Sequence, residues 1–388
     1  MSTSFFTPEL PKLISNLEQI VSINTENPPG REQEAAEWVC TQLRNMGFQS
    51  TTVEINLDRT NAIGVFENGP GPVFAFNTHL DVVPAGDGWT TDPFRLRRDS
   101  GLLYGRGSND AKGPLVSMLA AMEQMVRARD EWSGTLIGVF VADEEVASTG
   151  ARHYVKQAPK IDFCVVGEPT SCTTVAAHKG SMRPIVHVMG KTAHSGTPDL
   201  GVNAIIESAS LFSEVGSEHV RIRERHHDLV GSPSLTITRG NGGHADNVVP
   251  DLFEVMLDRR MIPGEDENAV KEEISALVAR AAAISGAHME IVDYKPTTGG
   301  ATETALDHPV VEAAQRACCH HHGHQTAITG FQGGCDLVHF RQVGAQGIVL
   351  GPGDLAVAHK PDEYVPEAEL VLAAKIYRDI AFDLLKSR

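Results

Sequence analysis

Three apolar segments of this sequence each run directly into acidic or imidazole side chains. The segments are residues 73–78, 135–141 and 161–166, and they are followed by His79, by Glu144 with Glu145, and by Glu168. Short apolar runs bounded by polar residues predict buried strands. Open α/β sheets place their chemistry at the carboxyl ends of such strands. We therefore expect an α/β fold with a functional site at that edge of its sheet.

The first of these segments ends in "THLDVVP", where His79 and Asp81 stand two positions apart. Alternate residues of a strand point to the same side, so the imidazole and the carboxylate would share one face. Such a pair can bind a metal ion. On its own, however, such a pair more often forms a simple hydrogen bond or lies in a solvated loop, so further ligands are needed.

Composition narrows the class of protein. A chain of 388 residues with a formal net charge of -17 predicts two domains and argues against binding to nucleic acid. We expect no membrane span and no leader segment, and therefore a cytoplasmic protein. The six cysteines form no Cys-x-x-Cys pair, which argues against a disulfide framework or a thiolate zinc knuckle. A cluster at Cys318–His324 has the residue types of a metal site, but it is also typical of a helix end.

The order of expected elements predicts an interrupted domain. Alternating helices and strands over residues 1–181 predict the first part of a layered α/β domain. Residues 182–295 instead predict a smaller α+β domain, with helices starting near Asn203 and Glu265. The alternation returns over residues 296–388. We therefore expect the smaller domain to be inserted into the larger one.

Further acids and histidines complete a set that suits two divalent ions. Asp110 lies in the glycine-rich turn "YGRGSNDAKG", Glu144 and Glu145 are adjacent, and His359 lies near the C-terminus. Adjacent buried acids repel each other unless a cation compensates their charge. The alternatives are a plain turn around Asp110 and a solvated loop at Glu144 and Glu145. A carboxylate must bridge two ions at ~3.5–4 Å, and we assign this to Asp110. Either Glu144 or Glu145 suits a general base, and the ion is open between zinc, cobalt and manganese.

Seven short motifs together resemble one enzyme family. They are "THLDVVP", "GRGSNDAKG", "ADEE", "GEPT", "AHKG", "AHSGTPDLGVNAI" and "LGPGDLAVAHKPDEYV". In this order they resemble the di-zinc aminoacylase and carboxypeptidase family, which includes acetylornithine deacetylases and succinyl-diaminopimelate desuccinylases. The resemblance runs from about residue 10 to the C-terminus and is greatest to the acetylornithine deacetylases. It implies an α/β zinc-hydrolase domain with an inserted dimerisation or lid domain.

The resemblance also implies a role for each matching residue. The metal ligands would be His79, Asp110, Glu145, Glu168 and His359, with Asp110 bridging. Glu144 would be the general base, and Asp81 would orient His79 as a second carboxylate behind the ligand. His194 would stabilise the oxyanion, in its own subunit's site or a partner's. Substrate contacts would come from Arg260, Asn247, Gly351 and Gly353.

The implied function is hydrolysis of a small N-acyl amino acid by a homodimeric enzyme. N-acetylornithine, and with it arginine biosynthesis, is the leading expectation. A desuccinylase, deformylase, aminoacylase or dipeptidase is the alternative within the family. Two departures stand out, since Asn77 replaces a common glycine and "FQGGCD" around Asp336 lacks the usual threonine or serine. A non-catalytic relative that has kept the fold is a remote alternative. A serine hydrolase is not expected, because this sequence contains no Gly-x-Ser-x-Gly motif.

Overall fold

The computed structural model describes residues 8–386, which divide into two compact units. The larger unit extends to Ala177 and continues through Glu303–Phe331 and from Cys335 onward. The smaller unit comprises His178–Thr302 and Gln332–Gly334. The smaller unit is thus inserted into the larger one, and the expected boundaries after residues 181 and 295 lie close to these divisions.

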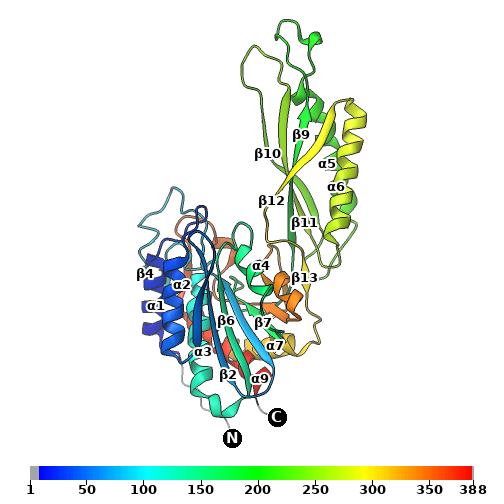
Figure 1. The fold of residues 1–388 in the computed structure, drawn as a ribbon. Coiled ribbons are helices and arrows are strands. Elements are labelled where there is room, and N and C mark those ends of the chain that lie inside the picture. The colour runs from blue at the N-terminus through cyan, green and yellow to red at the C-terminus, as the bar shows by residue number, and fades with distance from the viewer. Residues whose placement is uncertain (1–7, 387–388) are drawn as a thin grey trace. The chain divides into compact units, whose positions relative to one another are not determined.

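The larger unit is built around a mixed sheet, which confirms the predicted α/β class (Figure 1). Its strand order is β1-β2-β6-β3-β7-β15-β8-β13, with β14 pairing to β8. The strands are β1 (Gln49–Asn56), β2 (Arg59–Asn68), β3 (Val73–His79), β6 (Gly134–Val141), β7 (Phe163–Val166), β8 (Val175–His178), β13 (Thr302–Glu303), β14 (Thr329–Phe331) and β15 (Gln346–Val349). Because β3 is parallel to β6 and β7, and β15 is parallel to β7, these four strands end at the same edge.

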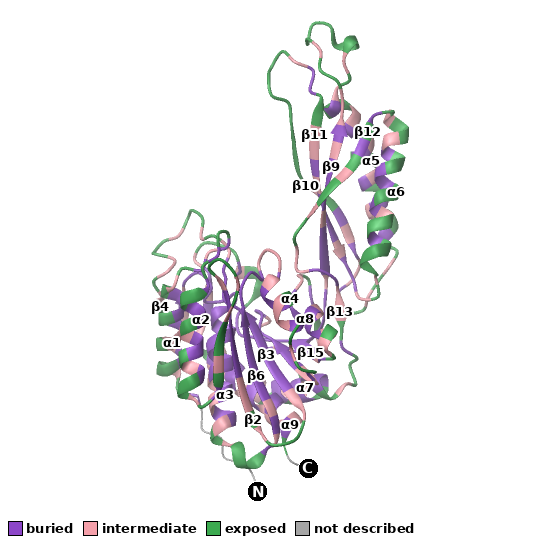
Figure 2. Ribbon diagram, viewed as in Figure 1, coloured by how far each residue is buried: buried purple, intermediate pink, exposed green. Residues whose placement is uncertain are grey.

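Helices cover this sheet and bury its apolar strands. They are α1 (Leu10–Ser22), α2 (Gln33–Asn45), α3 (Lys112–Arg127), α4 (Thr149–Val155), α7 (Pro309–His322), α8 (Leu337–Phe340) and α9 (Glu367–Leu385), with 3-10 turns η1 (Arg129–Glu131), η3 (Arg341–Val343) and η4 (Leu355–Val357). Helix α3 packs against both α1 and α9, so most of its surface is buried (Figure 2). A small sheet, β16-β5-β4, joins β4 (Arg97–Asp99), β5 (Leu102–Tyr104) and β16 (Tyr364–Pro366).

The smaller unit is an antiparallel sheet with its helices on one face. The strand order is β10-β11-β9-β12. The elements are β9 (Gly180–Met189), η2 (Pro198–Leu200), α5 (Ala204–Ile222), β10 (Ser234–Gly242), β11 (Leu252–Met261), α6 (Glu267–Ser285) and β12 (His288–Lys295). Asn203 and Asp266 cap the two helices, because each side chain accepts hydrogen bonds from backbone N–H groups of the first turn. The core between helices and sheet includes Val186, Leu211 and Leu277.

Among residues 8–386, no helix combines the length and the apolar character that crossing a bilayer requires.

Candidate active site

The carboxyl ends of three adjacent strands bring the predicted site residues together. In the sheet register, His79 at the end of β3 lies opposite Val141 at the end of β6, and Asn77 lies opposite Val166 at the end of β7. The acidic loop, which we define as residues 143–145, follows β6 directly, and Glu168 follows β7. Both His79 and Glu168 are buried. Local strand patterns therefore place these side chains at one edge, as expected from the sequence.

Two loops complete the cluster. Asp110 precedes α3, and His359 lies between η4 and β16. The two oxygens of Asp110 face different imidazoles, since Oδ1 lies 3.2 Å from His79 Nε2 and Oδ2 lies 3.3 Å from His359 Nε2. His359 Nε2 also lies 3.2 Å from Glu145 Oε2. Asp110 is thus placed between the two histidines, in the position a bridging carboxylate would need.

The spacing of the donor atoms suits metal ions. One ligand atom each from His79, Glu144 and Glu168 lie within 4.8 Å of one another, and the same holds for His79, Asp110 and Glu145. Buried Glu145 Oε1 has no hydrogen-bond partner within the described part of the chain. Carboxylate and imidazole donors in this number suit zinc, cobalt or manganese. The residues present therefore fit a pair of divalent ions.

The electrostatics of the cluster also favour a bound cation. Burial, followed by the charge of Glu168, raises the pKa of Glu144 well above its usual range. Burial and then the charge of Asp110 do the same to the pKa of Glu168. Hydrogen bonds to Asp110 and Glu145 raise the pKa of His359 to about 11. So many buried acids repel each other, and divalent cations would offset that repulsion.

Asp81 acts differently from the prediction. His79 Nδ1 lies 2.8 Å from the backbone carbonyl oxygen of Asp81 but 3.8 Å from its carboxylate. A carbonyl can only accept, so Nδ1 carries the proton and Nε2 is left free to bind a metal ion. The carboxylate instead accepts from the backbone N–H groups of Glu144, at 3.0 Å, and Glu145, at 3.2 Å. Asp81 therefore orients His79 through its main chain and holds the acidic loop through its side chain.

Glu363 is a supporting residue that the sequence reasoning missed. Its Oε1 accepts from the backbone N–H groups of Asn109 and Asp110, both at 3.0 Å, and its other oxygen pairs with the Arg106 guanidinium. The side chain is only 1% exposed. Its sequence signal was an acid four residues after His359, in "HKPDEYV". Glu363 thus fixes the backbone that carries the bridging aspartate.

Substituting Glu363 with alanine is expected to weaken divalent metal binding by ~10–100-fold, as is usual for residues that support metal ligands. The reason is that the Asp110 backbone would lose its acceptor. Titration of metal-free protein with Co2+ measures the effect. Glu367→Ala is the matched control, because it removes an acid paired with Arg98 away from the cluster. Unchanged Co2+ affinity in Glu363→Ala would contradict this role.

Gly351 and Gly353, which the resemblance implies as substrate contacts, form close contacts within the chain. The N–H of Gly351 donates to Thr170 Oγ1 at 3.1 Å, and that of Gly353 donates to Glu369 Oε2 at 2.7 Å. A Cβ on Gly351 would lie 2.5 Å from the backbone oxygen of Glu168. A Cβ on Gly353, whose φ is +89°, would overlap Asn109 Oδ1. Both glycines therefore allow the loops that carry Glu168 and Asp110 to pack closely.

Asp336 belongs to the same buried acid cluster. Its side chain is 1% exposed, and burial raises its pKa to about 6. Its charge in turn raises the pKa values of Glu144 and Glu168. The sequence marks Asp336 only by its departure from the usual family loop and predicts no role for it. Asp336 therefore adds to the negative charge that bound cations would offset.

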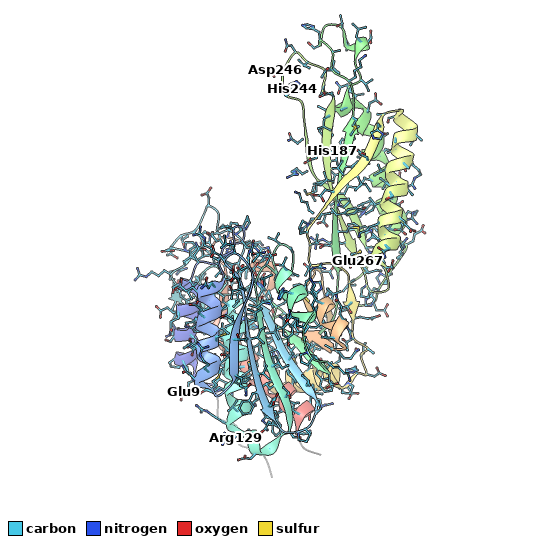
Figure 3. The ribbon with its side chains drawn as sticks, viewed as in Figure 1. Glu9, Arg129, His187, His244, Asp246 and Glu267 are labelled. Atoms are coloured by element: carbon cyan, nitrogen blue, oxygen red, sulfur yellow. The ribbon has the colours of Figure 1, made fainter. Side chains whose placement is uncertain are left out.

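Three predicted residues lie in the smaller unit, at two separate places. His194 and Asn247 are neighbours, because Ser195 N–H donates to the Asn247 backbone oxygen at 2.9 Å, and both are exposed. Arg260 lies near the far end of β11, where its Nε pairs with Asp258 at 2.7 Å. Figure 3 shows His244 and Asp246 at one end of this unit and Glu267 at the other. The strand between them rises by roughly 26 Å, so His194 and Arg260 of one chain cannot contact one small substrate.

Two further groups of side chains that could suggest a site are engaged in packing. Arg259, the neighbour of Arg260, is 1% exposed and pairs with Glu265 at 2.5 Å, so it is a buried structural cation. The Cys318–His324 cluster is absent from the groups that could hold a metal ion within residues 8–386. His321 Nε2 instead lies 2.6 Å from Asp379. His321 therefore contributes to the packing of α7 against α9, and His322 Nε2 lies 3.1 Å from the backbone oxygen of Cys172.

Comparison with known proteins identifies the family. Residues 75–383 match the model of peptidase family M20/M25/M40. An acetylornithine deacetylase of Vibrio parahaemolyticus is 30% identical, over 92% of this chain and 94% of that protein. A probable succinyl-diaminopimelate desuccinylase of Staphylococcus epidermidis is 28% identical, over 94% of this chain and 95% of that protein.

Solved structures share the fold at lower identity. An M20 family metallo-carboxypeptidase of Sulfolobus solfataricus has a TM-score of 0.80 and 16% identity, covering 96% of this chain and 99% of that one. A Bacillus subtilis protein described as a dinuclear metal binding peptidase has a TM-score of 0.73 and 19% identity, covering 97% and 98%. The family model matches most of the chain, and the relatives align with it over nearly their whole length. This chain belongs to peptidase family M20/M25/M40 and is a metal-dependent amidohydrolase.

Proposed function

We propose that this protein hydrolyses the amide bond of a small N-acyl amino acid, with N-acetylornithine as the leading candidate. The observation that carries the proposal is the convergence of the ligand-type residues with Glu144 at one edge of the sheet. The relatives named as acetylornithine deacetylases support the acyl group and the amino acid. A role in arginine biosynthesis, in the cytoplasm, follows from that substrate.

The site residues have distinct tasks in this proposal. His79, Asp110, Glu145, Glu168 and His359 would hold two divalent ions, most simply zinc, with Asp110 between them. When bound, such ions polarise an amide carbonyl and make water a stronger nucleophile near neutral pH. Glu144, which the distances leave beside His79 and Glu168, would take the proton of the attacking water and pass it to the leaving amine. The buried setting limits competition from bulk water.

Residues of the smaller unit would recognise the substrate. Arg260 carries a planar guanidinium that suits the α-carboxylate of an amino acid, and its present partner is Asp258. His194 and Asn247 would contact the polar acyl end and the developing oxyanion. Because His194 and Arg260 lie at opposite ends of one unit, we infer that they serve different sites, which requires a homodimer.

A panel of substrates tests the proposed specificity. Purified protein loaded with zinc or cobalt is expected to release free amine fastest from N-acetylornithine, compared with N-succinyl, N-formyl and dipeptide substrates. The Glu144→Ala variant, measured with each substrate, corrects for contaminating hydrolases. Activity confined to N-succinyl-diaminopimelate would assign the protein to the desuccinylases, which the Staphylococcus epidermidis relative makes the second candidate. Activity on none of the panel would overturn the proposed substrate class.

A further inference from the structure

Asn27 links two carboxylates behind the candidate metal centre. Its side chain is 2% exposed, and its Nδ2 lies 2.8 Å from Asp81 Oδ2 and 2.9 Å from Asp143 Oδ1. A carboxamide nitrogen carries two protons, so one can be donated to each acid. Without these two donors, Asp81 and Asp143 would face each other as buried like charges. The amide therefore joins two groups that would otherwise repel.

Arg59 holds the other side of the same amide. Its Nη2 donates to Asn27 Oδ1 at 2.6 Å, and its Nη1 lies 2.8 Å from Glu32 Oε1 and 3.1 Å from Asp143 Oδ1. A guanidinium can only donate, so the oxygen of Asn27 must face Arg59 and its nitrogen must face the acids. Arg59 thus fixes the orientation of the amide and adds a positive charge beside Asp143.

Both acids that meet at Asn27 hold the acidic loop. Asp81 accepts from the backbone N–H groups of Glu144 and Glu145. Asp143 has a φ of +66°, a left-handed conformation that non-glycine residues adopt at a cost. Its Oδ2 accepts from Thr149 Oγ1 at 2.7 Å, and its backbone oxygen accepts from Ala147 N and Ser148 N. The loop is therefore held from both sides, and Asn27 connects the two supports.

We propose that Asn27, oriented by Arg59, is a positioning residue that sets the backbone of residues 143–145 and thereby places Glu144 and Glu145. The inference rests on the proposed metal-dependent hydrolysis but is independent of which acyl amino acid is the substrate. Asp110 and Glu168 are held by other groups, through Glu363 and through packing against Gly351. Loss of Asn27 should therefore affect the ion that Glu145 binds more than the ion that Glu168 binds.

The chain offers a control asparagine, Asn68, which is partly buried and only stabilises the fold. Asn68 is at the opposite end of β2 from Arg59, and its Nδ2 donates to two backbone oxygens, those of Arg129 and Trp132, both at 2.7 Å. Replacing either asparagine removes two hydrogen bonds from an amide nitrogen. Only Asn27 directs those bonds to residues that hold the acidic loop.

The test compares Asn27→Ala and Asn27→Asp with Asn68→Ala and Asn68→Asp. Metal-free protein is titrated with Co2+ and followed by calorimetry and the Co2+ absorption spectrum, and its thermal unfolding is measured separately. In the Asn27 variants we expect one ion per chain to bind ~10–100-fold more weakly while the other changes little. We also expect kcat to fall with little change in KM, because Glu144 moves and the substrate contacts do not. In the Asn68 variants, Tm falls but both ions bind as in the wild type.

Arg59 gives a second, independent arm if an Asn27 variant does not fold. Arg59→Lys keeps the positive charge, and we expect it to retain most of the affinity for the ion that Glu145 binds. Arg59→Met removes the charge, and we expect that affinity to fall as in the Asn27 variants. If the Asn27 and Arg59→Met variants only lower Tm, as the Asn68 variants do, the positioning role is wrong. That result would leave the proposed function intact, because wild-type Co2+ binding and turnover are measured in parallel. Wild-type protein that binds no Co2+ would overturn the metal centre and this inference together.

Discussion

Replacing Glu144 with alanine is expected to lower kcat by ~10²–10⁴-fold, the usual contribution of a general base, while both metal ions still bind. The physical reason is that Glu144 is buried beside His79 and Glu168, where its carboxylate would accept the proton of the attacking water. Steady-state kinetics with metal analysis of the same sample measures both quantities. Glu144→Gln keeps the size of the side chain and should show the same loss.

Glu123→Ala is the control for this substitution. Glu123 pairs with Lys12 and Arg127 on the outside of the larger unit, so its loss should leave kcat unchanged. Near-normal turnover of Glu144→Ala with both ions bound would show that another group is the base. Loss of one ion together with turnover would make Glu144 a metal ligand, since its carboxylate also lies within ligand range of His79 and Glu168.

Mixing two inactive variants is expected to restore activity. If His194 serves the site of a second subunit, a heterodimer of Glu144→Ala and His194→Ala has one site with both residues intact. Random exchange of subunits then gives about a quarter of the wild-type activity in a two-fold symmetric dimer. If His194 acts within its own chain, every site in the mixture lacks one residue and no activity returns.

The complementation is measured after subunit exchange, with each variant alone as its control. Sedimentation of the same samples gives the oligomeric state directly. An active monomer would contradict the dimer and would leave the separation of His194 from Arg260 within the smaller unit unexplained. Restored activity would show that one chain supplies Glu144 and the other supplies His194.

Much of the site could be predicted because its signals are local in the sequence. An apolar run that ends in an acid or a histidine is a short pattern, and the parallel pairing of β3, β6 and β7 places such ends side by side. Asp110 and His359 required more, because their loops come from distant parts of the chain. Their residue types and the glycine-rich turn at Asp110 made them candidates, and the family resemblance implied their roles. The helices expected to start near Asn203 and Glu265 begin at Ala204 and Glu267.

The supporting contacts could not be predicted in the same way. Asn27 meets Asp143 across 116 positions of the chain, and Glu363 meets Asp110 across 253. A hydrogen bond between such distant residues depends on how whole elements pack, and no periodic pattern records it. The close packing at Gly351 and Gly353 could not be predicted for the same reason, since in a sequence a glycine that permits close packing looks like one that exposes its backbone.

The sequence alone determined which side chains could form the centre: strand patterns and residue types specify acids and histidines at the ends of β3, β6 and β7, with their chemistry. The tertiary structure decided how those side chains are held. It placed the Asp81 carboxylate on the acidic loop and its carbonyl on His79, and it put His194 far from Arg260 along β11. The physical reason is that residue type and hydrophobic periodicity are local properties of the sequence. Hydrogen-bond partners and the distances between side chains exist only once the helices and strands are packed.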